Sequence, residues 1–225
     1  MFMINRRHFL SRVGLRRAYS RGTTLIELII FIIIVSVALA GVLSVLDITA
    51  KNSADPLIRK QMLALAEALM DEVQLRPFTF CNGGDVNLKT ATSAVVGAGG
   101  CAATVQGYGY DASASARGDF SNLTNYCAVT PANSTSCPSM TLGTPNSVTS
   151  QVLDISGVGG SPPGYWATIS LTAEGLNGIA SSDPASANNA TALNVIRVTV
   201  IVESAFTTET IRLDSYRTRW AGNIL

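Results

Sequence analysis

The chain has 225 residues, few of them charged, and almost no histidine. Lys, Arg, Asp and Glu together make up 14% of it, and its single histidine is His8. A Ser-His-Asp triad, a Cys-His pair and a His-ligated metal site each need an imidazole, which the chain lacks after residue 8. We therefore predict that the protein is not an enzyme and that it carries no metal ion and no cofactor.

Two other kinds of chemistry find little support in the sequence. The Gly-rich stretch 97–100 is not followed by the Lys-Ser/Thr of a phosphate-binding loop. Acidic residues are scattered through the second half of the chain, and we expect these to be solvated surface carboxylates: Asp111, Asp119, Asp154, Glu174 and Asp183.

The charges are unevenly distributed along the chain. The 16 basic and 15 acidic residues give a net charge of +1, but residues 1–22 contain six arginines and no acid, and so carry +6. Residues 23–225 hold the remaining 10 basic and all 15 acidic groups, and carry −5. Residues 77–225 hold six basic and nine acidic groups, which predicts no nucleic-acid partner. We assign the basic residues near the C-terminus to the polar face of a last strand: Arg212, Arg217 and Arg219.

An uncharged run of 19 residues, from Leu28 to Leu46, follows the arginine-rich stretch. At about 1.5 Å per residue it nearly covers a hydrocarbon core of roughly 30 Å, which predicts a membrane-spanning helix. The arginines favour a cytoplasmic N-terminus, so everything after Asp47 is expected beyond the membrane. A secretory signal cleaved before Gly41 and an uncleaved signal anchor are the alternatives, and neither explains the acid Glu27 just before the run.

The residues where the two stretches meet resemble a known signal. Arg21-Gly22, the residues from Thr23 to Leu28 and the apolar run together are similar to the signal of type IV prepilins, which combines a basic leader, a glycine, a spaced glutamate and a span. The resemblance implies that a prepilin peptidase cuts between Gly22 and Thr23 and that the new amino group of Thr23 is methylated. It also makes Glu27 the glutamate of the fifth mature position. Thr23 departs from the family, whose mature chains more often begin with Phe or Met.

Glu27 is the residue of this signal with the clearest physical role. An ionised carboxylate in the hydrocarbon region costs on the order of 2.5–3.5 kcal/mol, so an acid at this place needs a partner. The Thr23 amine lies one turn away on the same helix, and the amine of a neighbouring subunit is the other candidate. The resemblance implies the second, in which the pair sets the axial register between helices. An acid that only sits at the edge of the bilayer is the alternative.

A second helical stretch follows the span. Pro56 either starts a new helix or kinks one long helix, and we favour one kinked helix that ends near Arg76-Pro77. We expect its apolar stripe to be the seat of a sheet. The stripe recurs close to a 3.6-residue period over residues 57–75, at Ile58, Met62, Leu65, Leu69 and Val73.

Residues 77–225 are predicted to form one globular domain. Residues 80–162 are rich in Gly, Ala, Ser, Thr and Asn, which predicts loops and short strands. Three later segments, 165–172, 192–202 and 208–216, are β-branched and partly alternating, and predict antiparallel strands. A three- or four-stranded sheet packed on the helix would bury both apolar faces. The predicted fold class is α+β and pilin-like, with a cleaved leader (1–22), a long N-terminal helix (23–76) whose span is 28–46, and a domain beyond the membrane (77–225).

All four cysteines lie after the span, at Cys81, Cys101, Cys127 and Cys137. Thiols beyond the membrane of a bacterium can be oxidised, and four of them allow three pairings. The shortest loops favour Cys81–Cys101 and Cys127–Cys137. A zinc site is disfavoured because the cysteines lack the close paired spacing of zinc ligands and no histidine is near.

A finer likeness lies outside the signal. The segments 54–61 and 66–81 and the closing residues 215–220 look most like minor prepilins of the MSHA (mannose-sensitive haemagglutinin) pilus type or V-type minor pilins. The resemblance implies a subunit of the inner membrane and pilus of a Gram-negative bacterium. Its partners would be major and minor pilins through the N-terminal helix, the prepilin peptidase and the inner-membrane assembly platform. A minor pseudopilin of a type II secretion system, an adhesin-like pilin with a ligand site in its loops, and an enzyme on a signal anchor are the alternatives.

Overall fold

The computed structural model describes residues 24–219, without the side chains of residues 50–55. The chain divides into two compact units, Met1–Ala50 and Lys51–Leu225. The predicted leader, the cleavage site between Gly22 and Thr23 and the methylated Thr23 lie outside the described residues, as does Trp220 of the closing segment.

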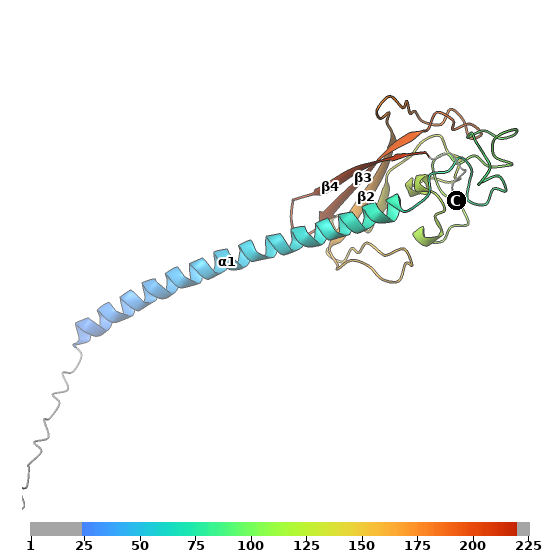
Figure 1. Cartoon of the computed structure of the whole chain (residues 1–225). Helices are drawn as coiled ribbons and strands as arrows, with labels where there is room; N and C mark the ends of the chain where they lie inside the picture. Colours follow the sequence, from blue (N-terminus) through green and yellow to red (C-terminus); the bar gives the residue numbers. More distant parts are fainter. Residues whose placement is uncertain (1–23, 220–225) are drawn as a thin grey trace, which may run out of the picture. The chain divides into compact units, whose positions relative to one another are not determined.

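Helix α1 extends from Leu25 to Gln74 (Figure 1). Its first part, Leu25–Thr49, is long and apolar enough to cross a membrane, and none of its most apolar stretch is buried. This helix could therefore anchor the chain in a membrane. Pro56 lies inside α1 and does not end it. Of the two arrangements that Pro56 permits, the structure has the continuous helix, in which the ring removes a backbone hydrogen-bond donor without breaking the element.

The sheet has four strands in the order β1-β2-β3-β4, and each neighbouring pair is antiparallel. The strands are β1 (Met140–Leu142), β2 (Tyr165–Ala173), β3 (Val195–Ser204) and β4 (Ile211–Thr218). The three predicted strands are confirmed, while β1 is too short to leave an alternating pattern in the sequence. β4 begins later than predicted because the Thr207 hydroxyl accepts the N–H of Glu209 at 3.2 Å, which holds the chain before β4 in a bend.

The core of the second unit lies between α1 and one face of the sheet, and Figure 1 shows β2, β3 and β4 running beside this part of the helix. Alternate residues of β2 and β3, such as Ile169 and Val200, face the helix because strand side chains alternate between two faces. Full burial of a side chain of this size contributes roughly 1.5–3 kcal/mol, so these contacts hold the unit together. The helix contributes Ala66, Met70 and the whole predicted stripe, Ile58, Met62, Leu65, Leu69 and Val73.

Side-chain hydrogen bonds replace regular structure between the helix and β1. Two short helical turns, η1 (Arg117–Asp119) and η2 (Leu123–Tyr126), lie in this region. Asn122 caps η2, because its Oδ1 accepts the Thr124 N–H at 3.2 Å while its Nδ2 donates to Thr79 at 2.8 Å. Buried backbone groups need partners, and amide side chains supply them where no sheet does. The prediction of loops and short strands over residues 80–162 is confirmed.

Two disulfides close loops in the same region. Cys81 is bonded to Cys101 and Cys127 to Cys137, with Cα–Cα distances of 5.4 and 4.9 Å. These are the pairs that the shortest loops favour. Because each of the four sulfurs is part of one of these two disulfides, none is available as a thiolate ligand for zinc.

Candidate functional site

Glu27 lies in the first turn of α1. Thr24 precedes the helix, and its Oγ1 accepts the Glu27 N–H at 3.4 Å. A Thr at the N-cap with a Glu three residues later has the spacing of a capping box, and a carboxylate in the first turn also stabilises the helix dipole. The Thr-x-x-Glu pattern was visible in the sequence, but we did not predict this local role. The Thr23 amine, one of the two candidate partners of Glu27, lies outside the described residues. The pairing of Glu27, in the same chain or with a neighbouring subunit, therefore stays a prediction.

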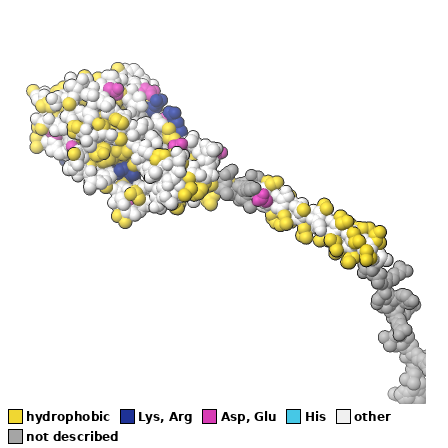
Figure 2. All heavy atoms as spheres, turned by 180° about the vertical axis from the view of Figure 1, so that it is seen from behind, with side chains coloured by type: hydrophobic (Ala, Val, Ile, Leu, Met, Phe, Trp, Pro, Cys, Tyr) yellow, Lys and Arg dark blue, Asp and Glu magenta, His cyan; other side chains and the backbone are white. Residues whose placement is uncertain are grey.

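Apolar side chains cover the rest of the first part of α1. Phe31 is 62% exposed and Val37 is 69% exposed, and Figure 2 shows hydrophobic side chains along the visible side of this stretch. The Ser36 hydroxyl donates to the Ile32 carbonyl at 2.7 Å, and Thr49 donates to the carbonyl of the residue four positions before it. These two hydroxyls are satisfied within the helix, which suits them to an apolar environment.

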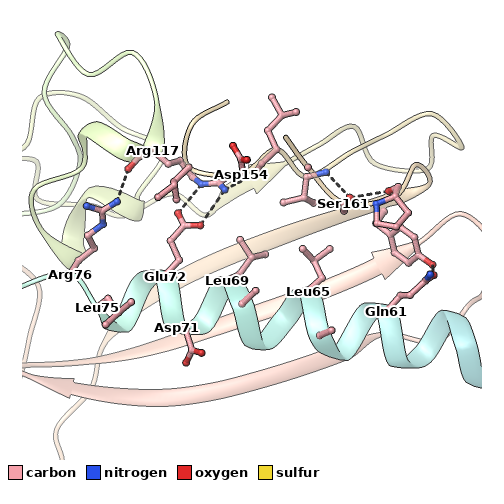
Figure 3. Close-up of a pocket in the computed structure, with 18 residues that line it drawn as sticks. Gln61, Leu65, Leu69, Asp71, Glu72, Leu75, Arg76, Arg117, Asp154 and Ser161 are labelled. Atoms are coloured by element: carbon pink, nitrogen blue, oxygen red, sulfur yellow. Dashed lines mark hydrogen bonds and ion pairs between the residues drawn. The ribbon is translucent and has the colours of Figure 1, made fainter. Parts of the chain in front are cut away.

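A groove of about 930 Å³ lies in the second unit, between α1 and the loop of residues 152–162 (Figure 3). Leu153 and Ile155 of the loop line it, and 47% and 46% of their surfaces are exposed. The groove is therefore a largely apolar surface that the unit leaves uncovered. Small and large apolar residues of α1 form its floor: Ala64, Leu65, Ala68 and Leu69.

A largely buried ion pair forms one wall of this groove. The Glu72 carboxylate accepts hydrogen bonds from Arg117 Nε at 2.9 Å, from Arg117 Nη2 at 3.2 Å and from the Tyr126 hydroxyl at 2.7 Å. The side chains of Arg117 and Glu72 are only 11% and 14% exposed. Arg117 also donates to the Leu153 carbonyl at 2.6 Å, and Arg76 donates to the Arg117 carbonyl at 3.1 Å. The cluster thus ties α1 to η1, η2 and the loop.

The Glu72–Arg117 cluster also changes the pKa of Tyr126. Burial raises the pKa of Tyr126, and the hydrogen bond to the Glu72 carboxylate raises that pKa further. The Tyr126 hydroxyl therefore stays protonated and keeps donating to Glu72 at physiological pH. The ion pair was not predicted from the sequence, because Arg117 lies 45 residues away from Glu72 along the chain.

Asp85 organises the loop that the first disulfide closes. Its carboxylate accepts the backbone N–H groups of Asn87, Ala102, Ala103 and Thr104 at 2.8–3.1 Å. Burial raises the pKa of the Asp85 carboxyl, but these four donors outweigh burial and hold the pKa at about 2. The loop is therefore stabilised by the ionised carboxylate.

The acidic residues predicted to be solvated lie near the surface, yet they make structural hydrogen bonds. Asp183 accepts the Tyr108 hydroxyl at 2.8 Å, and Glu174 pairs with Arg197 at 3.1 Å. The other three do the same: Asp111 accepts from Asn82, Asp119 from Ser115 and Asp154 from Ser156. Four of the five are exposed, as predicted, and Glu174 is half-buried. The hydrogen bonds are an addition to that prediction, because short polar side chains in loops bond to nearby donors.

The basic residues near the C-terminus do not share one face. Arg212 is exposed and pairs with Asp214 at 2.8 Å. Arg217 is half-buried and donates to the backbone carbonyl just after α1 at 3.5 Å. Arg219 stacks on the ring of Phe78 at 4.6 Å, and burial lowers its pKa to about 9. The prediction that all three arginines share one polar face is therefore wrong. Even- and odd-numbered residues of β4 point to opposite faces, and Arg217 lies on the face toward α1, while Arg219 follows the end of the strand.

Comparisons with other proteins give no family for this chain. No family model, no curated protein and no solved structure matches it. Over residues 24–219, no group of three or more His, Cys, Asp and Glu side chains could hold a metal ion. The function is therefore inferred from the two features described above, the apolar helix with Glu27 and the groove beside α1.

Proposed function

We propose that the protein is a minor type IV pilin, anchored by α1 in the inner membrane of a Gram-negative bacterium. A prepilin peptidase cuts the chain after Gly22, Thr23 is methylated, and the subunit then joins a pilus. The observation that carries the proposal is an apolar, uncovered helix with Glu27 in its first turn. A helix that is apolar on every side needs lipid or other apolar helices around it. The likeness of residues 21–28 to a prepilin signal also supports the proposal, because it adds the basic leader and Gly22 to these features.

Assembly of such a subunit needs no catalysis by this chain. The helix exchanges lipid for neighbouring apolar helices at little hydrophobic cost, because lipid tails are as apolar as leucine. Selection of the correct register must then come from shape and from polar groups. Glu27 is the only charged residue between positions 24 and 46, so its carboxylate is the group that can discriminate between registers. The amine of an adjacent subunit is its proposed partner.

Two substitutions separate the register role of Glu27 from its capping role. Gln at this position can keep a capping box but carries no charge, whereas Ala removes both functions. If charge pairing sets the register, Glu27→Gln and Glu27→Ala should both reduce incorporation into pili about tenfold or more, with membrane insertion and cleavage unchanged. Incorporation is measured by quantitative immunoblotting of sheared pili against membranes, in a strain whose piliation depends on this subunit. Normal assembly of Glu27→Gln would show that the residue serves only as a cap.

The processing step has its own test. Mass spectrometry of the mature protein should find an N-terminus at methylated Thr23. A mature chain that begins at Gly41 would indicate a cleaved secretory signal and would refute the pilin proposal. Partners that co-purify with the processed chain distinguish a pilus from a type II secretion system, since the two systems supply different subunits.

A further inference from the structure

We propose that the groove between α1 and the loop 152–162 is the docking site for the apolar helix of an adjacent subunit. The docking segment is the uncharged run from Leu28 to Leu46 of a second copy of this chain. The inference rests on the proposed function, because a neighbouring helix reaches a groove in the second unit only once subunits leave the membrane and assemble.

The shape of the groove fits a helix. Its floor alternates small and large residues along one side of α1, with Ala64 and Ala68 separated by one turn and Leu65 and Leu69 beside them. Small residues let a second helix approach closely, and the leucines provide ridges against which it packs. The part of α1 that lines the groove extends from Gln61 to Glu72, or roughly 17 Å at helical rise, which the 19-residue run is long enough to fill.

The charges of the groove fit an uncharged occupant. Glu72 and Arg117 neutralise each other, and the Tyr126 hydroxyl satisfies the same carboxylate, so an apolar helix can cover this pair without leaving either charge unpaired. Arg76, at the same wall, donates to the Arg117 carbonyl. In Figure 3, Leu65, Leu69 and Glu72 point to one side of α1, whereas Asp71 points away from them. Asp154, at the edge of the groove, accepts the N–H and hydroxyl of Ser156. The Asp154 carboxylate would repel an acidic partner at this edge, whereas the run 28–46 contains no charge.

The groove of the second unit and the apolar run 28–46 are both uncovered, which is unusual for apolar areas of this size. Val37 of the helix is 69% exposed, and Leu75, at the end of the groove, is 83% exposed. Each subunit therefore carries a helix that needs an apolar seat and a groove that needs an apolar occupant. Docking of one subunit's helix in the next subunit's groove satisfies both needs, and it extends from subunit to subunit as a head-to-tail contact does.

Disulfide trapping between two full-length copies tests this contact. Two copies with different tags are mixed in mild detergent, one with Ala68→Cys in the groove floor and the other with Val37→Cys on the apolar helix. The introduced thiols are the only free ones, because all four natural cysteines are in disulfides. Mild oxidation should link the two tags. With Thr172→Cys, an exposed position on the opposite face of the sheet, in place of Ala68→Cys, the yield should fall at least about fivefold.

A matched pair of substitutions shows whether the groove itself is required. Leu75→Asp adds a charge within the groove and should lower the linkage of Ala68→Cys to Val37→Cys at least about fivefold. Leu57→Asp makes the same change on an exposed leucine of α1 outside the groove lining and should leave the yield unchanged.

Three results would overturn the inference, and they separate it from the proposed function. Efficient linkage of two Val37→Cys copies without any linkage to Ala68→Cys would refute the groove contact and leave helix assembly standing. Linkage of two Ala68→Cys copies to each other, without linkage to Val37→Cys, would mean that grooves pack face to face. Loss of every linkage through Val37→Cys would count against the groove contact and the pilin proposal together.

Discussion

Replacement of Arg117 by Ala should lower the free energy of unfolding of the second unit by about 3–5 kcal/mol, because it breaks a largely buried ion pair from one side. Glu72 would keep only the Tyr126 hydroxyl as a partner, and its carboxylate, now 14% exposed, would lose two charged donors. The variant also loses the hydrogen bond to the Leu153 carbonyl. At roughly 2–4 °C per kcal/mol for a domain of this size, the melting temperature should fall by roughly 6–20 °C.

The assay is urea and thermal unfolding of the full chain in mild detergent, followed by tryptophan fluorescence, to which the buried Trp166, 5% exposed, contributes. Arg212→Ala is the matched control, since Arg212 pairs with Asp214 in the same geometry but with side chains 53% and 37% exposed, and it should cost about 0–1 kcal/mol. The double variant Glu72→Gln, Arg117→Met should be less destabilised than Arg117→Ala, because no charge is left unpaired. Equal losses for Arg117→Ala and Arg212→Ala would show that the pair does not hold α1 to the loops.

Two further outcomes are expected. The pKa of Asp85 is about 2 in the folded protein against an ordinary value of 3.8, so its contribution is present above pH 3.8 and is lost as the pH falls toward 2. Asp85→Asn should therefore be less stable than wild type at pH 7 and nearly equal to it at pH 2, as measured by urea unfolding; an equal deficit at both values would contradict this assignment. In graded reduction followed by alkylation and mass spectrometry, Cys127–Cys137 should open before Cys81–Cys101, because Cys137 is partly exposed while both cysteines of the other disulfide are fully buried. The reverse order of reduction would refute this explanation.

Elements with a strong local pattern were predictable. The stripe from Ile58 to Val73 follows the 3.6-residue period of a helix, and residues 165–172 alternate as a half-buried strand does. The strand boundaries were less accurate, since β3 begins at Val195 and β4 at Ile211. Side-chain hydrogen bonds hold the chain just before each strand, from Ser181 before β3 and from Thr207 before β4. β1, with three residues, exists only because it pairs with β2.

The candidate site was only partly predictable. Glu27 and the apolar run are features of the chain itself and were found by their composition and spacing. The capping role of Thr24 depends on where the helix begins, which the structure places at Leu25. The groove could not be predicted, because its walls come from residues 61–76, Arg117 and residues 152–165, which chain folding brings together.

The sequence by itself determined which side chains share a face: an apolar helix with one acid at its start, an amphipathic continuation, and strands with one apolar side. These properties follow from the fixed periods of helix and strand, so they are encoded locally. The tertiary structure alone decided which faces meet. Arg117 reaches Glu72, Arg219 stacks on Phe78, and loop 152–162 leaves a groove beside α1. Such contacts depend on how long, irregular loops close in space, and local periodicity carries no information about that closure.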